Sequence, residues 1–190
     1  MLFGAEKSWN VESETGEEYE RAASRLLYGV ESINMADTLR KLARASMGFN
    51  WSRFVMWYSA VTVEGKNMPL SFGGHPDHPR TAESVAETIR ACQAEEEKLL
   101  SLAKKGEGDK KVLWELILAC RGIVLMNKLL LYINGAEGCE EREGLQMEFD
   151  SWMQEYSSAW LCDNKPSGLG RIQEVINTVT TLPQNPVGTV

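Results

Sequence analysis

Histidine is nearly absent from this sequence, and no apolar run is long and uncharged enough to predict a membrane span. The two histidines, His75 and His78, lie in one tetrapeptide, so histidine chemistry could use no other place in the sequence. The longest apolar stretch, 112–133, still carries Glu115 and Arg121, whereas a bilayer-spanning helix needs about 20 nearly uncharged residues. We therefore expect no membrane partner.

Paired cysteine motifs are absent from the sequence, and basic residues are outnumbered by acidic ones. The four cysteines stand singly, without the C-x-x-C spacing typical of zinc sites, and we expect them to be reduced and mostly buried. Reduced cysteines, with no signal-peptide pattern in the first residues, favour a cytoplasmic protein. The 20 lysines and arginines stand against 27 acidic residues, a net charge of −7. A nucleic-acid-binding surface needs a basic patch, so we expect no nucleic-acid partner.

Proline is absent from 80–165, and apolar side chains recur there at three- and four-residue steps, the period of an α-helix. The pattern predicts helices over 81–105, 109–134 and 140–162. The middle helix is apolar nearly all round, which is typical of a buried central helix. Polar residues such as Glu95 are expected on the exposed side of the first helix.

Shorter helices are predicted on both sides of this stretch, over 15–28, 34–46 and 168–181. Segment 49–63 has apolar residues at helical spacing, but its β-branched and aromatic residues also suit a strand, and we favour the helix. Segment 64–80 is predicted to be a long loop. The sequence therefore predicts an all-α fold, a bundle of about five or six helices.

Little in the pattern points to catalysis or to a bound metal. Segment 75–78, His-Pro-Asp-His, contains metal-ligand types, but a metal site needs three or four converging groups, and the prolines favour a plain turn. The acidic run 95–97 is predicted to be a solvated helix face. The glycine pairs do not follow a strand, as phosphate-binding loops do. We expect no metal and no cofactor.

Two segments resemble a known enzyme family. Residues 4–10, GAEKSWN, resemble the last barrel strand of the family 20 glycoside hydrolases, the β-N-acetylhexosaminidases. Residues 160–169, WLCDNKPSGL, resemble the ending of many bacterial members. The helices between them resemble the C-terminal helical region that some bacterial members carry after the barrel, so the resemblance covers essentially the whole chain.

The resemblance implies a remnant of the last barrel strand with a linker over 1–14, followed by a helical domain over 15–182. The last residues, 183–190, are expected to form a flexible tail. The resemblance also implies a non-catalytic role for this chain. The catalytic pair of the family is an Asp-Glu dipeptide on a middle barrel strand, and this sequence contains no Asp-Glu dipeptide. A complete barrel needs about 250 residues, more than this chain of 190 residues offers.

The resemblance also implies two substrate-binding candidates and a set of partners. Trp9 matches a tryptophan that lines the N-acetyl pocket of the family, although packing at a domain junction is an equal alternative. Glu12 is a further candidate, because the family's acidic position is Val11 here. The implied partners are the catalytic barrel of the parent chain, a possible second subunit, and a carbohydrate with terminal β-linked N-acetylglucosamine or N-acetylgalactosamine. A stand-alone helical interaction protein and a small metal-binding enzyme using 75–78 remain open alternatives.

Overall fold

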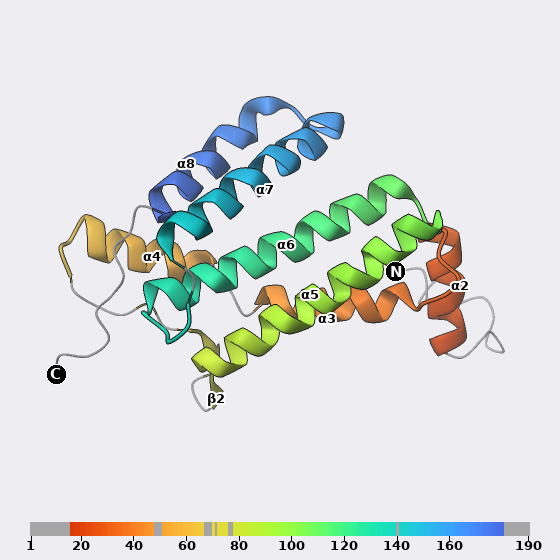
Figure 1. Ribbon diagram of the computed structural model, residues 1–190, viewed down its shortest axis with the longest axis horizontal. Coiled ribbons are helices and arrows are strands. Elements are labelled where there is room, and N and C mark those ends of the chain that lie inside the picture. The colour runs from red at the N-terminus through yellow and green to blue at the C-terminus, as the bar shows by residue number, and fades with distance from the viewer. Residues whose placement is uncertain are drawn as a thin grey trace, which may run out of the picture.

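The computed structural model is an all-α bundle, which confirms the predicted fold class (Figure 1). The residues that it describes are 16–47, 51–66, 70, 72–75, 78–139 and 141–180. The predicted strand remnant over 1–14 and the predicted tail over 183–190 lie outside this part of the chain.

Every helix predicted from the sequence is present, including the ambiguous segment 49–63. The helices are α2 (Gly16–Tyr28), α3 (Met35–Met47), α4 (Trp51–Thr62), α5 (Ala82–Lys105), α6 (Lys110–Ile133), α7 (Arg142–Asp163) and α8 (Leu169–Thr180), with the 3-10 turn η1 (Pro166–Gly168) before α8. Within the predicted loop 64–80, β1 (Gly74–His75) and β2 (His78–Pro79) pair as a minimal antiparallel hairpin.

Local capping explains where the two longest helices begin and end. The Thr81 hydroxyl accepts a hydrogen bond from the Ser84 backbone, and the Ser84 hydroxyl accepts one from the Thr81 backbone, a capping box that starts α5. Gly106 ends α5 in the left-handed conformation. The Asp109 carboxylate accepts hydrogen bonds from two backbone N–H groups in the first turn of α6.

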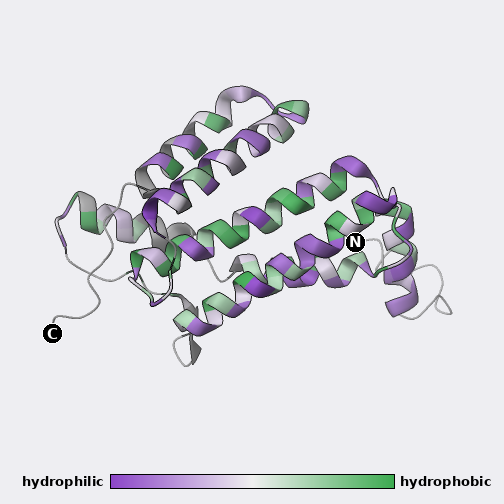
Figure 2. Cartoon of the chain, viewed as in Figure 1, coloured by the Kyte–Doolittle hydropathy of each residue, from purple (hydrophilic) through white to green (hydrophobic). Residues whose placement is uncertain are grey.

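Helix α6 is the central helix, as its apolar sequence predicts. It packs mainly against α5 and α7 and also touches α3, and Figure 2 shows it as mostly hydrophobic between more hydrophilic neighbours. By length and composition it could cross a membrane, but 56% of its most apolar window is buried inside the bundle. A core helix that is covered on several sides has this composition for packing reasons.

The buried side chains form two clusters along the two halves of α5 and α6. One cluster joins them to the α2–α3 end of the bundle through Val30, Met35 and Leu42. The other joins them to α4, α7 and α8 through residues such as Phe149 and Ile176. The bundle is therefore held together by α5 and α6, with the other helices packed around them.

The loop between α5 and α6 is fastened to the loop between α2 and α3. The Glu107 carboxylate accepts hydrogen bonds of 2.7 Å from the backbone N–H groups of Glu31 and Ser32. Gly108 has φ +90°, and a Cβ there would lie 2.9 Å from a side-chain carbon of Val30. The approach of the two loops therefore requires glycine at this position.

Candidate functional site: a cleft between α5, α6 and α7

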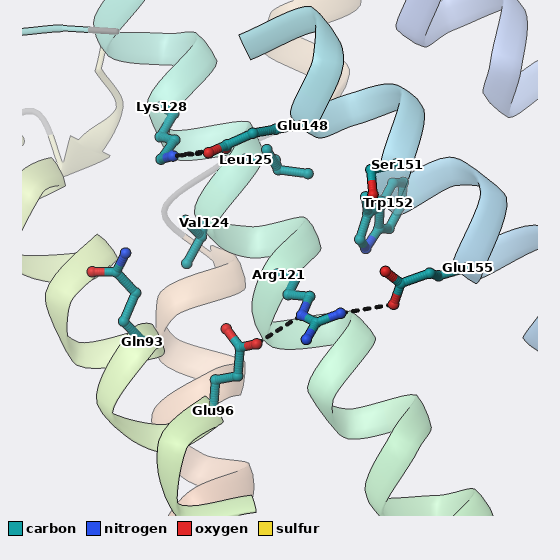
Figure 3. Close-up of a pocket in the computed structure, with 10 residues that line it drawn as sticks. All are labelled: Gln93, Glu96, Arg121, Val124, Leu125, Lys128, Glu148, Ser151, Trp152 and Glu155. Carbon is teal, nitrogen blue, oxygen red and sulfur yellow. Dashed lines mark hydrogen bonds and ion pairs between the residues drawn. The ribbon is translucent and has the colours of Figure 1, made fainter. Parts of the chain in front are cut away.

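The three longest helices enclose a cavity of about 320 Å³ on the side of the bundle (Figure 3). Its lining residues come from α5 (Gln93, Glu96), α6 (Arg121, Val124, Leu125, Lys128) and α7 (Glu148, Ser151, Trp152, Glu155). No sequence segment contains more than a few of these residues, so the cleft exists only after the helices pack.

Arg121 crosses one end of the cleft and connects all three helices. Its Nε donates to Glu96 on α5 at 2.7 Å, and its Nη1 donates to Glu155 on α7 at 2.7 Å. The guanidinium carbon also lies 5.4 Å from the ring centroid of Trp114, within reach of a cation–π contact. Because the three charged side chains are partly buried, this network is screened less than a surface ion pair.

A second ion pair closes the other end of the cleft. Lys128 on α6 donates to both carboxylate oxygens of Glu148 on α7, at 2.8 and 2.7 Å. The lining therefore contains two cationic and three anionic side chains, and both cations are engaged by carboxylates.

Trp152 forms part of the wall, and its orientation is fixed on three sides. Its indole Nε1 donates to the Leu118 carbonyl at 2.9 Å, and its six-membered ring lies against Gly122 on α6. One face stacks on Tyr156, one turn later on α7, with ring centroids 4.9 Å apart. Trp152 is among the residues that line the cleft.

The contact between Trp152 and Gly122 gives a testable prediction. A Cβ at Gly122 would lie 2.9 Å from Cζ2 of the indole, so Gly122→Val should lower the free energy of unfolding by about 1–3 kcal/mol through overpacking. The same substitution at Gly170, where nothing lies within 4 Å of a built Cβ, is the control. Chemical denaturation measures both variants, and equal stability of the two would contradict the packing described here.

A second groove lies beside the first, toward the end of α7. It has a volume of about 390 Å³ and is lined by Glu115, Leu118 and Ala119 of α6, by Trp152, Tyr156, Ala159, Trp160 and Asp163 of α7, and by Asn164. The aromatic rings form a ladder, in which Tyr156 and Trp160 have centroids 6.0 Å apart. The Trp152 and Tyr156 rings are stacked, whereas the Tyr156 and Trp160 rings are tilted by 34°.

The segment 160–169 builds the connection between α7 and α8. The Trp160 indole N–H donates to the Lys165 carbonyl at 3.0 Å. The indole ring also lies close to Gly168, because a Cβ built on this glycine would be 3.3 Å from Cζ2 of the ring. The Asn164 backbone N–H donates to the Trp160 carbonyl at 2.9 Å. Pro166 opens the 3-10 turn that leads into α8. Each of these residues has a local structural role.

The structure does not describe the side chains that the sequence predicts to bind substrate or metal. Trp9 and Glu12 belong to the N-terminal segment outside the described residues, so their roles remain predictions. His75 and His78 are opposite each other in the β1–β2 hairpin, but their side chains and Asp77 are not among the described groups. Within the described part of the chain, no three potential ligands converge to hold a metal.

The acidic run 95–97 is not the uniformly solvated surface that the sequence predicts. Glu95 is only 3% exposed and is bound by three polar side chains, Thr38, Lys41 and Lys98. Glu96 pairs with Arg121 in the cleft, and Glu97 alone is solvent-exposed. The prediction was wrong for Glu95 and Glu96 because neighbouring positions on a helix point about 100° apart.

The cysteines do not add a nucleophile to the cleft. All four are free, with Cys92 and Cys120 buried, Cys139 partly buried and Cys162 exposed. Burial raises the pKa of Cys92, and it raises that of Cys120 to about 12. Both buried thiols therefore stay protonated at neutral pH and behave as small core residues.

The chain matches no protein-family model, no curated protein and no solved structure. Its function therefore has to be inferred from its own residues and their arrangement.

Proposed function

We propose that this chain is a non-catalytic helical domain of a family 20 β-N-acetylhexosaminidase, which supports the catalytic barrel of the same parent protein in the cytoplasm. The sequence basis is the resemblance carried by residues 4–10 and 160–169. The observation that carries the proposal is the structural use of 160–169, which closes the α7–α8 connection through Trp160, Asn164 and Pro166. A domain that shares this motif is expected to share this helical hairpin.

The proposal also needs a surface through which the domain would support a barrel. The exposed ends of α6 and α7 offer one, since Trp114 is 39% exposed and Leu161 is 50% exposed. An ion pair between Lys111 and Asp163 joins these two helix ends, so both apolar side chains lie at the same end of the bundle. Interfaces between domains of one chain bury about 600–1,500 Å² and commonly include such side chains.

The size of the native protein tests the proposal. An antibody raised against this chain should detect, in extracts of the source cells, a protein larger than 21.3 kDa by at least a barrel of about 250 residues. The precipitated native protein should release 4-nitrophenol from 4-nitrophenyl N-acetyl-β-D-glucosaminide, and the isolated 190-residue chain should not. A native band at the mass of this chain alone would overturn the proposal.

A stand-alone helical interaction module is the second candidate. Leu26 and Leu27 on α2 favour it, because they are 77% and 53% exposed and adjacent on a helix at the edge of the bundle. Exposed apolar groups of this kind can mark a protein-binding surface. A native band at the mass of this chain would favour this candidate over the barrel-supporting domain.

A further inference from the structure

We propose that the cleft between α5, α6 and α7 binds a neutral, hydroxyl-rich ligand, a small saccharide. The inference goes beyond the supporting role proposed above and does not depend on it, because it uses only the groups that line the cleft.

The charges of the cleft select against ionic ligands. Arg121 is held by Glu96 and Glu155, and Lys128 is held by Glu148, so each cation already has a carboxylate partner. An anion would have to displace these carboxylates and would meet their repulsion. A cation would compete for carboxylates that already accept hydrogen bonds from Arg121 and Lys128. A neutral ligand is not repelled by the carboxylates and does not compete with Arg121 and Lys128 for them.

Two polar side chains at the rim of the cleft can form hydrogen bonds with the hydroxyl groups of a ligand. Gln93 on α5 and Ser151 on α7 are exposed and belong to the lining of the cleft, one on each side of it (Figure 3). Neither side chain forms a hydrogen bond to another residue in the described part of the chain. An amide and a hydroxyl each donate and accept hydrogen bonds, as every saccharide hydroxyl does.

The floor and one wall offer apolar contact. Val124 and Leu125 of α6 are buried beneath the cleft, and the partly exposed Trp152 of α7 lines it as well. A sugar ring presents C–H groups on its faces and hydroxyls around its edge. Apolar walls with a few placed polar groups are typical of small-molecule sites.

The dimensions limit the ligand to a small one. Figure 3 shows the Lys128–Glu148 pair at one end of the cleft and the Glu96–Arg121–Glu155 network at the other. Arg121 and Lys128 are two turns apart on α6, which corresponds to about 10 Å. The volume of about 320 Å³ is at the low end of the range for ligand pockets. A docked helix from another protein would have to break these ion pairs, whereas one or two sugar rings would not.

Nuclear magnetic resonance of the ¹⁵N-labelled chain tests the proposal. Glucose, N-acetylglucosamine and its β-1,4-linked disaccharide are titrated separately while the indole N–H signal of Trp152, identified with the Trp152→Phe variant, is followed. At least one sugar should shift this signal saturably. Gln93→Ala and Ser151→Ala should each weaken the affinity about threefold to tenfold, the effect of one lost neutral hydrogen bond. Gln154→Ala, exposed on α7 but outside the cleft, should leave the affinity unchanged.

Three results would overturn the inference. The first is the absence of a saturable shift with every sugar up to its solubility limit. The second is unchanged affinity in the Gln93→Ala/Ser151→Ala double variant, which would place binding elsewhere. The third is a shift with inorganic phosphate or choline but with none of the sugars, which would assign the cleft to an ion. None of these results alters the size of the native protein, so the inference and the proposed function fail separately.

Discussion

Phe149→Ala should lower the free energy of unfolding by about 3–5 kcal/mol, the usual cost of removing a buried aromatic ring. Phe149 is 1% exposed on α7 and packs in the cluster that joins α7 to α6, with Leu145 and Met153 one turn away on either side. Removal of the ring leaves a cavity that three long helices cannot readily collapse around. Because domains of this size are stable by only about 5–15 kcal/mol, such a loss is severe.

Urea denaturation followed by circular dichroism measures this effect. Met147→Ala is the matched control, because Met147 lies on the same helix but is 68% exposed, and its truncation should change stability by no more than about 0.5 kcal/mol. The denaturation midpoint should fall strongly in the Phe149 variant while the slope stays constant. Similar midpoints for the two variants would show that α7 does not bury this row of side chains.

The sequence predicted the existence and limits of α7 but not its buried face. At three- and four-residue steps, the apolar residues of this segment form a stripe through Leu145 and Phe149 to Trp152, then on to Tyr156 and Trp160. The structure instead buries the row 145–149–153 and places the three aromatic residues beside it, partly exposed. The step of three from 149 to 152 moves to the neighbouring row of the helix. Since both rows are apolar, periodicity alone could not choose between them.

The cleft could not have been predicted from local motifs. Its ion pairs join Arg121 to Glu96, 25 residues earlier in the chain, and to Glu155, 34 residues later. Their meeting depends on the relative rotation of three helices, which the period of each helix does not specify. The start of α6 is set locally instead, because the Asp109 carboxylate accepts hydrogen bonds from backbone N–H groups two and three residues later.

Glu95 was predicted to be exposed, although its position along α5 indicates a buried residue. The buried residues of α5 include Cys92, Glu95, Leu99 and Leu102, at steps of three and four. Glu95 therefore occupies a core position, and its charge misled the sequence interpretation. A carboxylate at such a position needs partners from other elements, and α3 provides Thr38 and Lys41.

Glu95→Ala should lower the free energy of unfolding by about 1–3 kcal/mol, because it removes a buried acceptor that joins α3 to α5, whereas Lys41 and Lys98 are 45% and 48% exposed and can be solvated without it. The Glu95 carboxylate accepts hydrogen bonds from the Thr38 hydroxyl at 2.9 Å and from Lys98 Nζ at 2.7 Å, and Lys41 Nζ lies 3.2 Å away. Thr38 is 2% exposed, so the variant leaves a buried hydroxyl without its acceptor. Glu97→Ala, exposed two residues along α5, should change stability by no more than about 0.5 kcal/mol.

The pH dependence separates this electrostatic effect from a simple loss of packing. Burial acts to raise the pKa of Glu95 and is the largest single influence, but the hydrogen bonds from Lys98, Thr38 and Lys41 together outweigh it and lower the pKa below 4.5. A carboxylate whose pKa is lower in the folded state stabilises the fold fully above the pKa of the unfolded chain, and this contribution is lost as the pH falls through the folded pKa. The stability difference between the native protein and Glu95→Ala should therefore stay constant near neutral pH and shrink below about pH 4.5. The difference in the free energy of unfolding between the native protein and Phe149→Ala should not shrink over the same pH range. If the difference for Glu95→Ala also persisted in acid, the packing volume of the Glu95 side chain rather than its charge would hold α3 to α5.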